Sequence, residues 1–496
     1  MAMKKQITTF SICASTALVF GLGASVNLAI GKLATSALHP SSTAVLWIID
    51  AYLIVFGCLL IPGGALGDKL GRKRMMLTGL VILAAGSLIS AVVPTVALVI
   101  AGRGLTGLGA ALILPSSLPL MMAAYPPERR EHAVAIWTSM TAVGGVLGNV
   151  AGGVILQYFD WQILFVVAAP FAIILAIVLA YAAPSVPGHM RRIDAGGSAT
   201  LIVTVFAVMF AVIEGRALGW TQPVVVGALV LAVVFGIVFV RYELRQAEPL
   251  LDPRVFGVPG ARAGAIGVCC SFLAMYAMFY FNGQYLMSIK GYSAMVAGFA
   301  VVPLALLMAL LARVTPKLGQ RFGNRAMVVG GLLCLALGLV LLGFCTATTS
   351  YPVYLVFLLL IGAGAALSNP ALSSAIVSSL PPAQMGTGTG LNSFSREFGG
   401  ALGLALFGTL VGGMFSHRLS ESGMSTDGRD VGAVLRTAGA NGAAVRDAFS
   451  YATNIGFWVV GGILVVATLI IASWLPGRVA PGAPEGAAAK DKVGVR

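Results

Sequence analysis

The fold of this chain is indicated by the stretch Gly64-Ala65-Leu66-Gly67-Asp68-Lys69-Leu70-Gly71-Arg72-Lys73-Arg74, which directly follows a long apolar run. The stretch carries five charged residues, and a second apolar run begins at residue 75. Apolar runs of about 20 residues are long enough to cross a bilayer as helices. We therefore expect a short basic loop here that joins two membrane helices.

The composition agrees with a protein that crosses the membrane many times. Hydrophobic residues make up 58% of the 496 residues, charged residues make up only 10%, and the mean hydropathy is +0.95. Soluble domains carry about a quarter charged residues. Because the hydrocarbon region offers no water to backbone groups, runs of this length form helices. The expected fold is an all-α integral membrane protein.

The sequence lacks the patterns of an enzyme, a metal protein or a nucleic-acid-binding protein. The six cysteines lie in apolar runs without metal or disulfide spacing, and the four histidines are scattered. The net charge of +14 sits in short loops, where it reports membrane orientation rather than a nucleic-acid partner. We expect no catalytic residues, no metal and no cofactor.

Fourteen apolar runs are predicted to span the membrane. An even number places both termini on one side, and most lysines and arginines lie in the terminal segments and loops of that side. Because short cytoplasmic loops are enriched in Lys and Arg, both termini are expected to be cytoplasmic. The predicted spans are 10–31, 44–63, 75–94, 97–122, 133–155, 162–182, 196–213, 223–240, 263–285, 294–312, 326–346, 352–376, 388–413 and 452–474.

The basic stretch resembles the signature loop of the major facilitator superfamily, Gly-x-x-x-Asp-Lys-x-Gly-Arg-Lys-Arg. A similar loop at 316–325 indicates an internal repeat, which is how transporters of this fold are built. The resemblance implies a gating motif made of Gly64, Asp68, Gly71 and Arg72.

The resemblance also implies the domain organisation. Two six-helix bundles, at 1–185 and 261–475, would flank an inserted helix pair at 186–260, which brings twelve helices to fourteen. The segment 416–450 is expected to be an outer loop, acting as a lid or as a solvated connector. The tail at 476–496 is expected to be disordered and cytoplasmic.

Two further stretches resemble motifs of exporters in this superfamily. In the helix at 97–122, Arg103 matches an arginine implied in proton coupling, although Thr106 stands where the family has glutamine. The helix at 133–155 resembles the antiporter motif Gly-Pro-x-x-Gly-Gly, with asparagine in place of proline. Close helix packing would also explain these small residues. The motif residues are Gly144, Gly148, Asn149, Gly152 and Gly153.

The first-helix proton carrier of fourteen-helix drug:proton antiporters is missing. Their motif has an aspartate five residues before the position of Asn27, and this chain has Leu22 there. Two other acids lie in apolar runs, Asp50 and Glu397, and the second follows Arg396. Intramembrane ionisable residues are costly and mark ion or substrate paths, although each acid could instead be a fixed counter-ion to an arginine. The expected proton-coupling residues are Asp50, Arg103, Arg396 and Glu397, with Asp50 as the carrier.

A stretch rich in methionine and aromatic residues in the helix at 263–285 is suited to apolar ligands of varied shape. Amide side chains would add polar contacts. Such a stretch is also ordinary in membrane helices. The expected substrate-binding residues are Asn27, Trp47, Tyr52, Met275, Tyr276, Phe279, Asn282 and Asn392.

Taken together, the motifs resemble those of the fourteen-helix drug:proton antiporter branch of the superfamily. The resemblance implies a monomeric exporter in the bacterial cytoplasmic membrane, driven by the proton gradient alone. It would move amphipathic, cationic or neutral drug-like or antibiotic molecules outward by alternating access. Its partners would be this small-molecule substrate, protons and the lipid bilayer. The alternative is proton-coupled transport of one specific metabolite, such as a peptide, a sugar or a secondary metabolite.

Overall fold

A computed structural model describes residues 2–34, 36–92, 95–126, 130–184, 194–246, 249–380, 385–424, 431, 434–435 and 438–475. The described residues form helices and turns with no strand, as the composition predicts. Thirteen of their helices are long and apolar enough to cross a membrane. The predicted number of fourteen spans stays a prediction, and the predicted tail at 476–496 lies outside the described residues.

The first half of the chain contains six long helices, and a further pair follows. Charged side chains that reach toward water let helices continue past the apolar runs, so several are longer than predicted. Their bounds are α1 Ala2–Ala34, α2 Ser42–Leu70, α3 Arg72–Val92, α4 Val96–Ala123, α5 Arg130–Tyr158, α6 Gln162–Ala182, α7 Ala195–Leu218 and α8 Pro223–Glu243.

The second half of the chain also consists mainly of long helices. Short 3₁₀ turns at Pro253–Gly257 and Gly439–Asn441 precede α9 and α16, and α9 ends in a π-helical turn, Tyr285–Ile289. The helices are α9 Pro259–Gln284, α10 Ala294–Phe299, α11 Val302–Phe322, α12 Asn324–Leu342, α13 Tyr351–Ser378, α14 Met385–Glu421 and α16 Gly442–Trp474.

The basic stretch is helical rather than the loop expected from the sequence. Helix α2 continues to Leu70 and α3 begins at Arg72, so the connection is the single residue Gly71. Its φ of 98° lies in a region that side chains other than glycine rarely adopt. The Gly71 amide donates to the Gly67 carbonyl over 3.1 Å and closes the last turn of α2. The glycine spacing therefore serves a sharp helix-to-helix break.

The run predicted at 294–312 is divided into α10 and α11. Pro303 lies at the start of α11 and has no backbone N–H to continue the preceding helix. The Tyr351 hydroxyl donates to the Ala300 carbonyl at the break, over 2.9 Å. The expected single span is therefore bent, and a side chain of the loop-to-α13 junction satisfies a backbone group there.

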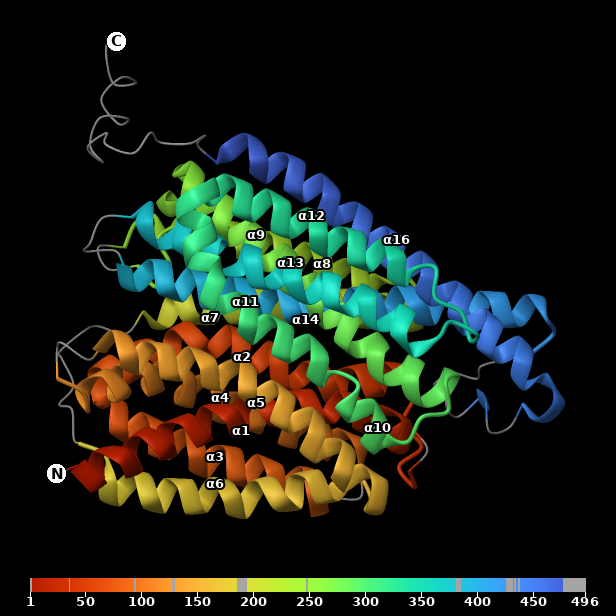
Figure 1. Cartoon of the computed structure of the whole chain (residues 1–496), viewed down its shortest axis with the longest axis horizontal. Helices are drawn as coiled ribbons and strands as arrows, with labels where there is room; N and C mark the ends of the chain where they lie inside the picture. Colours follow the sequence, from red (N-terminus) through yellow and green to blue (C-terminus); the bar gives the residue numbers. More distant parts are fainter. Residues whose placement is uncertain are drawn as a thin grey trace, which may run out of the picture.

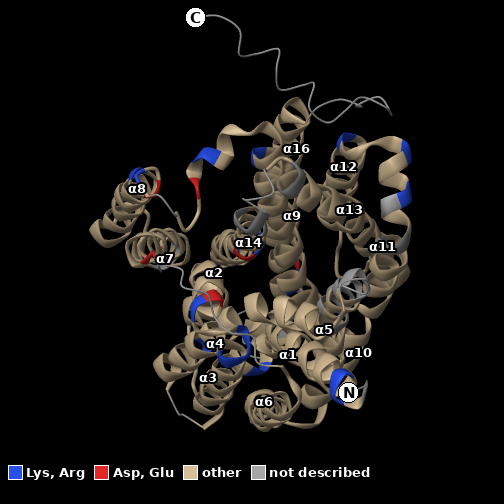
Figure 2. Ribbon diagram, turned by 90° about the vertical axis from the view of Figure 1, so that its left-hand side faces the viewer, with Lys and Arg blue, Asp and Glu red and all other residues tan. Residues whose placement is uncertain are grey.

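The two halves lie side by side, with their helices running along a common direction (Figure 1). Helix α1 begins and α16 ends at the same end of the bundle, which we call the termini end; the other is the distal end. Figure 2 looks onto the termini end, where lysine and arginine residues gather. Helices α7 and α8 pack on each other outside the two bundles, and α7 lies against α2 and α14.

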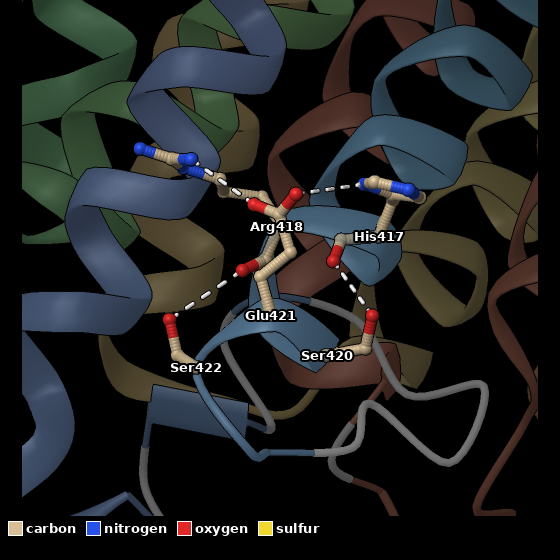
Figure 3. A network of polar contacts seen from close by, with 5 residues as sticks. All are labelled: His417, Arg418, Ser420, Glu421 and Ser422. Atoms are coloured by element: carbon tan, nitrogen blue, oxygen red, sulfur yellow. Dashed lines mark hydrogen bonds and ion pairs between the residues drawn. The ribbon is translucent and has the colours of Figure 1, made fainter.

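The predicted outer loop at 416–450 is helical at both of its margins. Helix α14 extends to Glu421 and α16 starts at Gly442. Polar side chains support the end of α14: Arg418 Nη1 lies 3.0 Å and His417 Nδ1 3.7 Å from the Glu421 carboxylate (Figure 3). The distal end therefore carries a helical projection rather than a loop over its whole length.

Candidate functional site

A cavity of about 270 Å³ lies between the two halves. It is lined by α1, α2, α4 and α5 on one side and by α9, α11, α13 and α14 on the other. Apolar walls with a few polar groups are typical of small-molecule sites. The aromatic lining residues are Phe20, Tyr52, Phe56, Phe272, Tyr276 and Phe279. The amide residues are Asn27, Asn149, Asn282 and Asn369, and the charged residues are Arg103, Arg396 and Glu397.

Six of the eight residues predicted to bind substrate lie on the cavity wall, namely Asn27, Tyr52, Met275, Tyr276, Phe279 and Asn282. The other two lie elsewhere. Trp47 Nε1 donates to Glu214 Oε1 of α7 over 2.7 Å, and the Trp47 ring packs near Phe206 and Phe210. Asn392 Oδ1 accepts a hydrogen bond from the Ser373 hydroxyl over 2.9 Å. These two residues connect helices to one another.

The sequence reasoning passed over several wall residues and one intramembrane acid. Phe20, Phe56 and Phe272 line the cavity, but an aromatic residue in an apolar run carries no sign of which way it faces. Glu214 lies near the end of α7, one residue past the predicted span at 196–213, so the sequence offered no reason to count it among the intramembrane acids. Its partner Trp47 could be found only from the packing of α7 on α2.

An ion pair on α14 lies at the cavity wall. Arg396 Nε and Glu397 Oε1 are 2.8 Å apart, and their side chains are 20% and 1% exposed. The Arg396 guanidinium lies 5.4 Å from the ring centre of Phe20 and 5.8 Å from that of Phe272. The second carboxylate oxygen, Glu397 Oε2, is buried and has no hydrogen-bond partner in the part of the chain that the structure describes. Of the two charged side chains, Arg396 is the one that a ligand in the cavity can contact.

Asp50 is absent from the cavity lining and lies on the face of α2 that packs on α14, as its helical spacing from Leu46 and Gly57 shows. A Cβ added to Gly408 would meet the Leu46 side chain at 2.6 Å, and one added to Gly57 would lie 3.4 Å from Glu397 Cβ. Asp50 follows Leu46 by four residues and precedes Gly57 by seven, so it shares their face of α2. The Asp50 side chain is fully buried, and among the described residues neither carboxylate oxygen has a hydrogen-bond partner.

Arg103 is held within the first half. Its Nε donates to the Ile48 carbonyl over 3.0 Å, and its Nη1 donates to the Thr106 hydroxyl over 3.2 Å. The guanidinium lies 4.6 Å from the ring centre of Tyr52. Among the described residues Arg103 has no ion pair, so it is not the fixed counter-ion of Asp50 in this structure. Thr106, at the position of the family glutamine, is its side-chain partner.

One row of glycines in α5 packs on α1 within the first half. A Cβ added to Gly148 would lie 2.1 Å from the Gly21 carbonyl oxygen, which shows direct backbone contact. Gly144 and Gly152 make similar approaches to Ala17 and Ser25 of α1. These motif residues therefore act as a packing surface between neighbouring helices.

The adjacent face of α5 reaches the other half at α10. A Cβ added to Gly153 would lie 2.6 Å from the Ala294 carbonyl oxygen, and one added to Gly298 would lie 2.4 Å from the Asn149 carbonyl oxygen. Asn149 also lines the cavity, and its amide donates to the Gly145 carbonyl over 3.0 Å. The motif predicted for antiport thus joins α1, the cavity and the second half.

The residues of the predicted gating motif tie α2 to α3 and α4 at the termini end. Arg72 forms an ion pair with Asp68, one turn earlier in the chain. Arg72 Nη1 also donates to the Gly64 carbonyl over 3.2 Å and to the Pro115 carbonyl over 3.0 Å. Asp68 therefore orients an arginine that holds the end of α2 against α4.

Comparison with known proteins agrees with this architecture. The sequence pattern of the Major Facilitator Superfamily matches residues 12–404. The multidrug resistance protein Stp of Mycobacterium tuberculosis is 31% identical over 375 residues, covering 75% of this chain and 70% of that protein. The puromycin resistance protein pur8 of Streptomyces alboniger is 31% identical over 423 residues, covering 84% and 83%.

A solved structure shows the same fold at low identity. It is a bacterial homolog of the human lysosomal transporter Spinster, in an inward-facing and unoccupied conformation. Its TM-score is 0.69 at 15% identity, with 95% of this chain and 97% of that chain covered. The chain is a multi-pass membrane transporter rather than an enzyme, and it belongs to the Major Facilitator Superfamily.

Proposed function

We propose that this protein exports amphipathic drug-like or antibiotic molecules across the bacterial cytoplasmic membrane in exchange for protons. The observation that carries the proposal is the aromatic and amide-lined cavity between the halves, together with a buried acid, Asp50, on the α2 face that packs on α14. The resistance functions named for the relatives support a drug or antibiotic as cargo over one specific metabolite.

The distal end is assigned to the outside and the termini end to the cytoplasm. Lysine and arginine residues gather at the termini end, in keeping with the positive-inside bias (Figure 2). In the distal part, α5 touches α10, and a Cβ added to Gly283 would lie 3.1 Å from the Asn27 carbonyl oxygen. Such contacts close the outer path, so we assign this conformation to the inward-facing state of an alternating-access cycle.

Asp50 is the proposed proton carrier. An ionised carboxylate without a partner in a dry interface is unfavourable by several kcal/mol, so the closed α2–α14 contact selects the protonated side chain. Substrate that enters from the cytoplasm spreads α2 from α14, admits water to Asp50 and releases the proton inward. The ionised side chain then opposes closure, and the outer path opens.

The energy available per cycle is sufficient for resistance. One proton moving through about 100 mV supplies roughly 2.3 kcal/mol. At about 1.4 kcal/mol per tenfold change, this sustains roughly a fiftyfold concentration ratio of substrate.

The test is transport by the full-length protein in proteoliposomes, with puromycin and a fluorescent dye as substrates. Asp50→Asn should abolish uphill transport driven by a proton gradient and still permit downhill movement, whereas Asp50→Glu should retain part of the pumping. Glu397→Gln is the matched comparison, since it removes the other acid of the same interface. Uphill transport that survives Asp50→Asn and disappears in Glu397→Gln would move the carrier to α14. Uptake of one metabolite alone would favour the alternative substrate class.

A further inference from the structure

The charged side chains on the cavity wall differ in the fraction of their surface that is exposed. Three charged side chains line the cavity, and two of them are arginines. Arg103 is 1% exposed and is occupied by the Ile48 carbonyl and Thr106. Glu397 is also 1% exposed and gives one oxygen to Arg396. The charge that a ligand can reach is therefore the Arg396 guanidinium.

Neither acid of the α2–α14 interface is placed to receive a cationic ligand. Asp50 is fully buried and is absent from the cavity lining. Glu397 already pairs with Arg396 through Oε1, and its other oxygen, Oε2, is buried. A cation that approached Oε2 would therefore meet a carboxylate whose charge is already balanced, next to a guanidinium of its own sign.

Arg396 has N–H donors that are available to a ligand. Within the part of the chain that the structure describes, its hydrogen bonds are limited to the one from Nε. An arginine has five N–H donors in a planar fork, and this fork suits carbonyl and carboxylate oxygens. The rings of Phe20 and Phe272 flank the guanidinium, so an aromatic ligand that binds there also gains ring contacts.

We infer that the preferred cargo is an aromatic molecule that carries carbonyl or carboxylate acceptors and is neutral or anionic, rather than an organic cation. The acceptor oxygen binds the terminal nitrogens of Arg396, and the ring system lies among Phe20, Phe272 and Tyr276. Asn27 and Asn369 each have a buried amide oxygen without a partner, which can accept from hydroxyl groups of the same ligand.

This inference rests on the proposed function, because it names the substrate class of the same cavity. It differs from the expectation from sequence, which was a cationic or neutral molecule, because it excludes organic cations and adds anions. It also fits the role of Asp50. An acceptor that uses the terminal nitrogens leaves the Arg396–Glu397 pair intact, so the proton can be exchanged at Asp50 without competition for the ligand site.

A binding experiment without any proton gradient tests the substrate class separately from proton coupling. The probes are fluorescein, which is anionic near neutral pH, and rhodamine 123, which is cationic on the same three-ring scaffold. Fluorescence anisotropy with the purified full-length protein gives both dissociation constants. We expect fluorescein to bind about tenfold or more tightly than rhodamine 123, the scale of one charge-assisted hydrogen bond.

Three variants decide which group is responsible. Arg396→Gln should weaken fluorescein binding by about tenfold to a hundredfold and leave rhodamine 123 binding unchanged or stronger. Arg396→Lys keeps the charge and should restore part of the loss, which shows that the fold is intact. Arg418→Gln is the control, because Arg418 lies at the distal end of α14 and pairs with Glu421.

The opposite preference would overturn the inference. If rhodamine 123 binds more tightly and Glu397→Gln removes that binding, the cavity selects cations through Glu397. If Arg396→Gln and Arg418→Gln affect fluorescein equally, the effect is general surface charge rather than a site. Neither result bears on proton coupling, which the uphill transport of Asp50→Asn tests independently.

Discussion

We expect the contact between α5 and α10 to set how tightly the distal end can close, and Gly153→Ala tests this expectation. The added Cβ would lie 2.6 Å from the Ala294 carbonyl oxygen, well inside the 3.4 Å at which ordinary van der Waals contact begins. The opposing atom is backbone, so no side chain can rotate away and the two helices must separate. Overpacking of this kind costs about 1–3 kcal/mol. Because the contact joins the two halves, the cost falls on the closed state and not on the fold of either half.

A cost of about 1–3 kcal/mol corresponds to a fivefold to 150-fold shift toward the state that is open at the distal end. The assay uses Ala24→Cys, a small residue of the cavity lining, in a background without the native cysteines. An impermeant thiol reagent added to intact cells should label this cysteine faster by that factor when Gly153→Ala is present. Proton-driven export should fall, because the cycle can no longer populate the closed state efficiently.

Two glycines of the same helix provide matched controls. A Cβ added to Gly145 would have no atom within 4 Å, so Gly145→Ala should leave the labelling rate and thermal stability unchanged. A Cβ added to Gly148 would lie 2.1 Å from the Gly21 carbonyl oxygen inside the first half, so Gly148→Ala should lower thermal stability instead. Equal labelling of Gly153→Ala and the parent would refute the assignment of this contact to closure.

Two further experiments test contacts of α2. Asp68 is 37% exposed, and exposed ion pairs contribute less than about 1 kcal/mol to stability, so Asp68→Asn should keep thermal stability and ligand binding. Transport should slow greatly, because Arg72 loses the carboxylate that orients it toward α4. A loss of binding together with transport would assign Asp68 a structural role. Trp47→Phe and Glu214→Ala should show a coupling energy of about 1.5 kcal/mol or more in a double-mutant cycle of unfolding, since they remove the same charge-assisted hydrogen bond. Additive effects would show that the inserted helix α7 does not brace α2 through this pair.

Hydropathy was sufficient to predict most of the helices, because apolar length alone decides whether a segment can cross a bilayer. It was insufficient for their ends. The basic stretch was predicted as a loop, yet Asp68 and Arg72 satisfy each other across the helix end and leave only Gly71 outside a helix. The break before α11 had a signal in Pro303, but the tyrosine that completes it lies in the sequence near the start of α13.

Only part of the cavity wall was predicted, because the sequence does not show which neighbouring helix covers each face. The aromatic stretch of α9 contains many suitable residues, and Met275, Tyr276 and Phe279 do line the cavity. Trp47 looked equally suitable, but it faces α7, an element whose position depends on packing between distant segments. Helical periodicity places residues on a face; it does not say which neighbour covers that face.

The same limit explains why the two acids are distinguished only by their surroundings. Glu397 and Asp50 lie in one interface between α2 and α14, about 10 Å apart along α2 at 1.5 Å per residue. Glu397 has an arginine within 2.8 Å, so we propose that it stays ionised whether the interface is open or closed and that it holds Arg396 at the cavity. Asp50 has no such partner and can be buried without that penalty only as the neutral acid. A group whose charge must change when the interface closes is the group that can couple proton movement to closure, and among these two acids only Asp50 meets that condition.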